Sequence, residues 1–210
     1  MNTLTELSLT GFLAETAGKE PVPGGGSISA LNGAIAAALT EMVANLTIGR
    51  KKYAEAEPIM ITLAERAAAI QKELVADINR DSEAYNKVFA AFKLPKETDE
   101  EKAYRSEQIQ VNTKYAAQVP MEVARRVSAL LPDIETVAHQ GNQNAVTDAC
   151  VAMMCARCAV IGALLNVRIN LTSINDASFV AQMTAEADRL EADVVAREAQ
   201  VLAHTKELCK

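Results

Sequence analysis

The stretch that decides the fold spans residues 21–46 and reads PVPGGGSISALNGAIAAALTEMVANL. Its two prolines and three consecutive glycines disfavour regular structure, whereas the residues that follow are small or apolar, with Gly33 as the one helix breaker. We therefore predict an irregular turn up to Gly25 and a helix over residues 27–48. The small side chains of this helix predict that another helix packs closely against it.

Helix signals continue on both sides of this stretch. Thr3 and Glu6 form a capping-box pattern for a short first helix that ends near Gly18. Apolar residues at three- and four-residue spacings predict long helices over the ranges 58–92, 144–169 and 177–208.

A second capping-box pattern, Thr98 with Glu101, predicts the start of a helix that is rich in charge. Pro120 is expected to kink this helix, because its ring removes one backbone hydrogen bond. Pro132 is expected to end it.

The predicted fold class is all-α, a bundle of long, partly kinked helices in a single domain over residues 1–210. Hydrophobic residues make up 50% of the chain but aromatic residues only 4%, so small aliphatic side chains must fill the core. The middle helices are apolar around most of their circumference. We therefore expect a homodimer that forms through small-residue helix faces.

Charge and hydropathy exclude several classes of protein. The formal net charge is −6 and no basic stripe is present, which argues against nucleic-acid binding. Of two apolar runs, residues 27–39 are closely followed by Glu41 and residues 149–167 are interrupted by Arg157, so neither is expected to span a membrane. The N-terminus shows no signal-peptide pattern, and we expect a cytoplasmic protein.

The glycine-rich turn is the first candidate site, and its residues are Pro23, Gly24, Gly25, Gly26 and Ser27. Free N–H groups at the start of a helix favour an anion or a developing negative charge. The pattern is neither a dinucleotide-binding fingerprint nor a Walker loop. The alternative is a tight connection that lets two helices pack.

Two aspartates are candidates for acid–base chemistry. Asp81 lies in an amphipathic helix with Tyr85 one turn later, and Asp148 follows Asn142 and Asn144 at the entrance to an apolar helix. A carboxylate held among helices can have a raised pKa, or can stabilise a cation if it stays ionised. Either aspartate could equally be a surface residue of its helix.

Gly49 is expected to end the helix over residues 27–48. The basic turn that follows contains Arg50 and Lys51, which could receive a polyanionic substrate tail. Such a run is also typical of a solvated helix end, where the helix dipole favours cations.

No metal site is expected. Cys150, Cys155 and Cys158 have the spacing of plant-type iron–sulfur proteins, and Cys209 could be a fourth ligand. They lie inside an apolar helix, however, whereas a cluster needs ligands from an irregular loop. We expect buried structural thiols instead.

Four segments resemble one known family, in the right order along nearly the whole chain. They are PVPGGGSISA (21–30), MVANLTIGRKKY (42–53), a DxxAY segment (81–95), and GNQNAVTDA through NVRIN (141–170). Together they resemble the cyclodeaminase/cyclohydrolase family, which includes the cyclodeaminase half of formiminotransferase-cyclodeaminase and free-standing methenyltetrahydrofolate cyclohydrolases.

The resemblance implies an all-helical dimer with a tetrahydrofolate derivative in a cleft lined by the glycine-rich turn, and no further cofactor. Asp148 or Asp81 would act on the cationic one-carbon bridge, and Arg50 and Lys51 would attract a polyglutamate tail. The reaction would be hydrolysis of the methenyl form, which the segments LTIGRKKY and LPKETDEEKA favour, or cyclodeamination of the formimino form. A function of another class, a helical interaction module without catalysis, stays open.

Overall fold

The computed structural model describes residues 3–210, which form six α-helices and three short 3₁₀ helices without any strand. Long helices follow one another with short connections, which confirms the predicted all-α class. In chain order the elements are η1 (Leu4–Glu6), α1 (Leu9–Thr16), α2 (Gly25–Asn45), η2 (Lys51–Tyr53), α3 (Glu57–Phe92), α4 (Asp99–Gln140), η3 (Gln143–Ala145), α5 (Val146–Leu171) and α6 (Ala177–Leu208).

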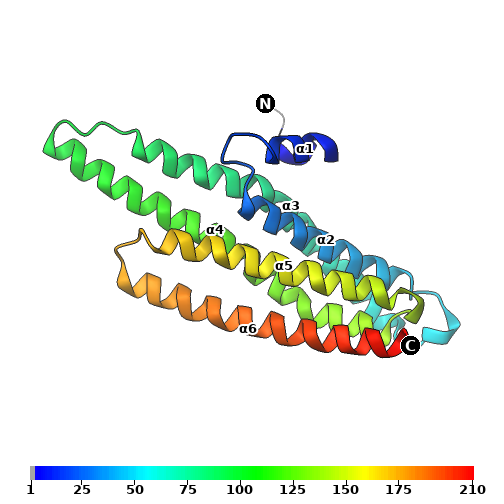
Figure 1. The fold of residues 1–210 in the computed structure, drawn as a ribbon. Coiled ribbons are helices and arrows are strands. Elements are labelled where there is room, and N and C mark those ends of the chain that lie inside the picture. Colours follow the sequence, from blue (N-terminus) through cyan, green and yellow to red (C-terminus); the bar gives the residue numbers. More distant parts are fainter. Residues whose placement is uncertain (1–2) are drawn as a thin grey trace.

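Helices α2 to α5 form the bundle, and α6 packs along α5 and α4 (Figure 1). Helix α2 contacts α3 and α5 along its length, and runs antiparallel to both. The short α1 lies beside the bundle, near the N-terminus of α2. The start of α2 and the end of α5 therefore lie at one end of the shared interface, and the end of α2 and the start of α5 at the other.

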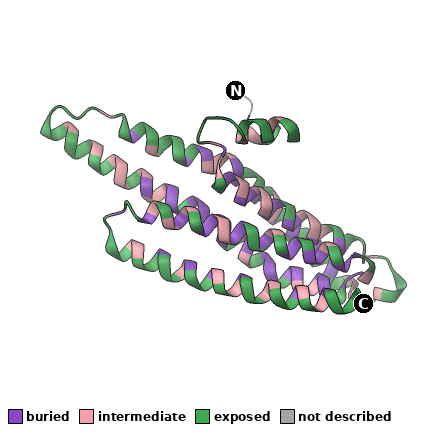
Figure 2. Cartoon of the chain, in the orientation of Figure 1, coloured by how far each residue is buried: buried purple, intermediate pink, exposed green. Residues whose placement is uncertain are grey.

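The core consists of small aliphatic side chains, as the composition predicted. Buried residues follow the facing sides of the long helices (Figure 2). On α5 alone, five alanines are completely buried: Ala149, Ala152, Ala156, Ala159 and Ala163. Since an alanine stripe is smooth, α5 can lie close to two helices at once.

Two glycines mark the closest helix contacts. A Cβ on Gly33 of α2 would lie 2.6 Å from Cγ2 of Val127 on α4, and a Cβ on Gly162 of α5 would lie 2.5 Å from the hydroxyl of Ser29 on α2. Both distances are shorter than van der Waals contact. The absence of a side chain at these positions therefore sets the spacing of α2 from its neighbours.

Several predicted boundaries need correction. Helix α2 begins at Gly25, so Gly25 and Gly26 lie in its first turn instead of in a preceding loop. The capping box of Thr3 and Glu6 is present, but it closes only the 3₁₀ turn η1, and Ser8 caps the separate helix α1.

Pro132 does not end α4, which continues to Gln140. Proline removes one backbone hydrogen bond, but its neighbours Leu130, Leu131 and Ile134 are fully buried and hold the helix in place. Tertiary packing therefore overrides the local helix-breaking signal. The turn after α2 was predicted correctly, since Gly49 adopts a positive φ of 75°.

Helices α2 and α5 are also long and apolar enough to cross a membrane, by length and composition alone. In the most apolar 18-residue segment of each helix, 56% is buried inside the bundle for α2 and 50% for α5. This burial is what core helices of a helical bundle show.

The Gly33 contact gives a stability prediction. Alanine at this position gains up to about 1 kcal/mol of helix propensity, but its Cβ overlaps Val127, and overpacking a core costs about 1–3 kcal/mol. We expect Gly33→Ala to lower the free energy of unfolding in urea titrations. Asn45→Ala, on the exposed last turn of the same helix, is the control and should stay within about 0.5 kcal/mol of wild type. A urea midpoint of Gly33→Ala equal to that of wild type would contradict the close contact between Gly33 and Val127.

Candidate functional site

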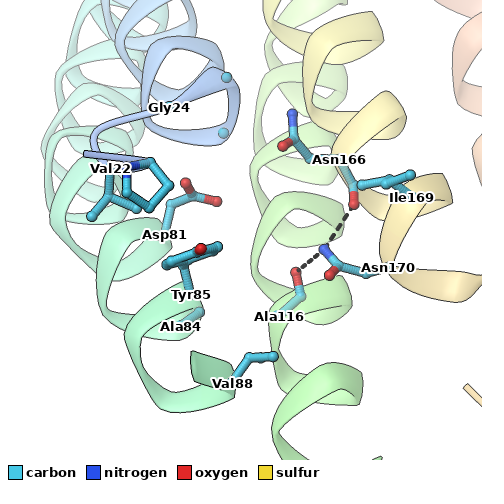
Figure 3. A pocket seen from close by; sticks show the side chains of 13 residues that line it. Val22, Gly24, Asp81, Ala84, Tyr85, Val88, Ala116, Asn166, Ile169 and Asn170 are labelled. Atoms are coloured by element: carbon cyan, nitrogen blue, oxygen red, sulfur yellow. Dashed lines mark hydrogen bonds between the residues drawn. The ribbon is translucent and has the colours of Figure 1, made fainter. Parts of the chain in front are cut away.

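A pocket of about 360 Å³ opens at the N-terminus of α2. Its walls come from the glycine-rich turn and from α3, α4 and α5, whose side chains converge on it (Figure 3). Residues far apart in the sequence thus share one cavity. They are Pro21, Val22, Gly24, Gly25, Gly26, Asp81, Ala84, Tyr85, Val88, Ala116, Asn166, Ile169 and Asn170.

The carboxylate of Asp81 lies directly against the first turn of α2. A Cβ on Gly26 would overlap both carboxylate oxygens and the carbon between them, so only glycine allows this approach. The carboxylate thus lies beside the free N–H groups of this turn, and interaction with the backbone of Ser27 favours its ionised form. The carboxylate therefore occupies the place of the missing side-chain cap, since the N-cap residue Gly24 provides none.

Ser27 holds the first turn of α2 in place beside Asp81. Its side chain is fully buried, and its hydroxyl donates to the carbonyl oxygen of Ile78 at 2.8 Å. The hydroxyl lies 3.1 Å from that of Ser82 and 3.4 Å from Oδ2 of Asp81. These contacts fasten the start of α2 to α3, which fixes the position of the carboxylate.

Burial raises the pKa of Asp81 above the ordinary aspartate value. The hydrogen bonds from the backbone and side chain of Ser27 oppose this effect, and the nearby negative charge of Asp77 adds to it. A carboxyl group whose pKa is moved toward neutrality can both accept and return a proton, which is what acid–base catalysis requires.

One turn along α3, the ring of Tyr85 forms a side of the pocket and is 40% exposed. It stacks on Phe89, with ring centroids 6.3 Å apart and an angle of 15° between the planes. A held aromatic face of this kind suits a flat, partly apolar ring system.

The wall on α5 contains two asparagines that the sequence analysis did not select. Asn166 donates through Nδ2 to the carbonyl of Gly162 at 2.8 Å. Asn170 donates to the carbonyls of Ala116 and Asn166 at 3.1 and 2.9 Å. Within residues 3–210 neither side-chain oxygen accepts a hydrogen bond, so both are free to accept one from a ligand N–H group. Their i, i+4 spacing in an otherwise apolar helix was the signal that could have identified them.

Five of the predicted site residues lie together in this pocket: Gly24, Gly25, Gly26, Asp81 and Tyr85. Pro23 and Ser27 are buried beside it and do not line it. Their contribution is to hold the turn and the helix start in place.

The remaining predicted residues lie at the opposite end of α2 and α5. Since α2 has 21 residues, its two ends are about 30 Å apart. Arg50 and Lys51 are exposed there, Asn144 is exposed, and Asp148 is half-buried in the first turn of α5. One subunit therefore does not bring Asp148 and Asp81 together, although both stay predicted catalytic residues.

Asn142 has a clear structural task at that end. Its N–H donates to the hydroxyl of Thr47 at 2.8 Å, its Nδ2 donates to the carbonyl of Leu46 at 3.1 Å, and its Oδ1 accepts from the N–H of Asn144. The side chain thus ties the connection between α4 and α5 to the end of α2. Its predicted contact with substrate stays a prediction.

The cysteines differ from expectation. Cys150 is buried and Cys155 is half-buried, but Cys158 and Cys209 are exposed, so the prediction of buried thiols was wrong for these two. Cys158 is exposed because it lies on the face of α5 that no helix of the described bundle covers. In the part of the chain that the structure describes, no three His, Cys, Asp or Glu residues are grouped so that they could hold a metal ion.

Fold and pocket together define an all-helical protein with a half-buried carboxyl group of raised pKa at the edge of a ligand-sized cavity. The family model for formiminotransferase-cyclodeaminase matches residues 8–189. The chain belongs to this family, as the four sequence segments predicted.

Individual relatives agree with this assignment. The methenyltetrahydrofolate cyclohydrolase of Methylorubrum extorquens is 40% identical over 182 residues, which cover 87% of this chain and 88% of the relative. The formimidoyltransferase-cyclodeaminase of Mus musculus is 35% identical over 84% of this chain, which spans only 32% of the mouse protein. The crystal structure of formiminotetrahydrofolate cyclodeaminase from Thermotoga maritima superposes with a TM-score of 0.88 at 32% identity and covers 98% of both chains.

The raised pKa of Asp81 predicts a cost in stability. The unfolded chain releases this proton at the ordinary aspartate pKa and the folded chain only at a higher pH, so stability falls as pH rises through that interval. We expect Asp81→Asn, which stays neutral, to have a higher Tm than wild type at pH 7. The two Tm values should converge below the ordinary aspartate pKa. A lower Tm for the variant at pH 7 would contradict the cost of burial.

Proposed function

We propose that this protein hydrolyses 5,10-methenyltetrahydrofolate to 10-formyltetrahydrofolate. The observation that carries the proposal is the 40% identity, over most of both chains, with a protein named methenyltetrahydrofolate cyclohydrolase. The pocket supports it independently, because a folate derivative has a flat ring system, ring N–H donors and a reactive carbon that needs a proton acceptor nearby.

Asp81 is the acid–base residue in this proposal. The methenyl carbon bridges two nitrogens and carries positive charge, so water attacks it while Asp81 accepts a proton from that water. The C–N bond to the ring nitrogen then breaks as Asp81 returns this proton to that nitrogen. The remaining hydroxyl proton is released to solvent as the C=O bond forms, which leaves the formyl group on the other nitrogen. A carboxyl group with a raised pKa fits both steps.

The other pocket residues hold the substrate. Tyr85 offers its ring face to the pterin, and Gly24, Gly25 and Gly26 allow the flat ring to approach the backbone. The free oxygens of Asn166 and Asn170 accept hydrogen bonds from N–H groups of the ring. No other cofactor is needed, since the substrate itself carries the reactive carbon.

Cyclodeamination is the second candidate. The close superposition with the formiminotetrahydrofolate cyclodeaminase of Thermotoga maritima favours it. Here the second nitrogen, outside the ring, attacks the formimino carbon on the ring nitrogen. The proton of this second nitrogen and one from protonated Asp81 pass to the formimino nitrogen, which leaves as ammonia. The two reactions share the same cyclic cation, so one pocket suits both.

We further propose a homodimer. Large apolar side chains are exposed on adjacent faces of α2 and α5, namely Ile35, Met42, Leu46, Val151, Met154, Leu165 and Ile169. Leu165 and Ile169 are 58% and 66% exposed. Exposure of this row of seven apolar side chains to water is unfavourable. A second copy with the same row is a partner of matching chemistry, and a two-fold axis would pair the two rows.

Such a dimer would also give a role to the residues at the far end. A two-fold axis near the middle of α5 exchanges its ends, so Asp148 and the basic turn of one copy approach the pocket of the other. Asp148 would then stabilise the cationic bridge, while Arg50 and Lys51 would attract a polyglutamate tail of the substrate.

The activity itself is tested with purified protein by following methenyl absorbance. We expect methenyltetrahydrofolate to disappear faster than without enzyme, and Asp81→Asn to slow this by about 10²- to 10⁴-fold. Glu83→Gln, which removes an exposed carboxylate from the same helix, serves as the control and should keep full activity. Appearance of the methenyl species from the formimino substrate would support cyclodeamination. If neither substrate reacts, the enzymatic proposal fails.

The shared site predicts complementation between subunits. In a mixed dimer of Asp81→Asn and Asp148→Asn chains, one site carries both lesions and the other is intact. Random mixing of two inactive variants should therefore restore about a quarter of wild-type activity. Leu165→Glu should produce inactive monomers in light scattering, whereas Val195→Glu, an exposed apolar position on α6, should stay dimeric. Absence of complementation would contradict the shared site.

A further inference from the structure

A charged cluster around one buried carboxylate, that of Asp77, lies one helical turn before Asp81. Asp77 is only 2% exposed and accepts hydrogen bonds from Nη1 of Arg80 at 2.9 Å and from Nη1 of Arg126 at 2.8 Å. Glu122 on α4 contacts both arginines, and Glu73 accepts from Nε of Arg126 at 2.7 Å.

Packing alone does not require this cluster. A buried ionic group costs desolvation energy, and an apolar replacement of similar volume is often as stable. Burial accordingly raises the pKa of Asp77, while the two guanidinium groups oppose that shift and favour its ionised form. The protein therefore keeps a carboxylate at a place where burial disfavours its charged form and two arginines are needed to offset this.

Its position relative to the pocket is what distinguishes Asp77. Residues 77 and 81 are four apart on α3, so their Cβ atoms lie about 5–6 Å from each other on one helix face. Asp77 is buried and Asp81 is half-buried, so water screens the interaction between their charges less than it would at the surface. The negative charge on Asp77 accordingly contributes to the raised pKa of Asp81.

We propose that Asp77 is a positioning residue, held by Arg80 and Arg126, which sets the proton occupancy of Asp81 and thereby the pH range of the folate reaction. This inference rests on the catalytic role proposed for Asp81. Asp77 itself does not line the pocket, so we expect it to act through Asp81 and not by contact with a substrate.

The other groups around Asp81 leave this role to the cluster. Helix α2 presents only the hydroxyl and N–H of Ser27, and α5 presents the neutral amides of Asn166 and Asn170. On α3, Tyr85 presents its ring and hydroxyl to the pocket. The charge that acts on Asp81 thus comes from Asp77. Asp77 in turn pairs with Arg80 on α3 and Arg126 on α4, and Glu122 contacts both arginines.

Two substitutions should move the pH dependence in opposite directions. Asp77→Asn removes a negative charge, so the pH–rate limb that reports Asp81 should move down by about one pH unit. Arg126→Gln removes a positive charge that offsets Asp77, so the same limb should move up. Arg126→Lys keeps the charge and should return the limb to near its wild-type position.

The measurement is kcat against pH for the full-length protein, with carboxyl ¹³C NMR of aspartate-labelled protein as a second readout of Asp81. A limb that does not respond to Asp77→Asn, or that moves the same way in Asp77→Asn and Arg126→Gln, overturns the inference. The NMR titration also separates the two proposals. Opposite shifts of the Asp81 signal in a protein without folate turnover would reject the proposed function, while showing that Asp77 and Arg126 still set the proton occupancy of Asp81.

Discussion

The rest of the structure depends on the contact between the first turn of α2 and the carboxylate of Asp81. A helix that begins with glycines has no side chain to cap its free N–H groups, and a carboxylate from another helix occupies that place. The contact is possible only because Gly26 lacks a Cβ. It joins α2 to α3 and at the same time leaves a carboxyl group at the edge of a pocket, so one contact serves both the fold and the site.

Small side chains make this arrangement possible along the whole bundle. Gly33 and Gly162 let α2 approach α4 and α5 more closely than any larger residue would allow, and the alanines of α5 continue the same smooth surface. Close packing of helix axes brings the ends of α2, α3 and α5 around one cavity instead of leaving them apart. The scarcity of aromatic residues in the chain is therefore a geometric requirement of the site as well as of the core.

The electrostatics of the site work against stability. Burial of Asp81 and Asp77 raises the pKa of both, and a folded protein gains nothing from carboxyl groups whose charged form is disfavoured. Acid–base catalysis by a carboxyl group requires a raised pKa of this kind, even though the same burial costs stability. The arginines around Asp77 limit the cost at that residue, whereas Asp81 is left with hydrogen bonds from Ser27 and an opening to the pocket.

The sequence by itself determined the helical class, the α6 boundaries and the turn at Gly49. It also determined the membership of four segments in one family. Hydrophobic periodicity, helix capping and the conformational freedom of glycine all act over a few neighbouring residues, so they can be read from the sequence. It could not determine that α4 passes through Pro132, that Asn166 and Asn170 share a pocket with Asp81, or that Asp148 lies about 30 Å away at the far end of the bundle. Those facts depend on which helix faces meet and in which direction each helix runs. Such contacts join residues far apart in the chain, so only the tertiary structure decided them.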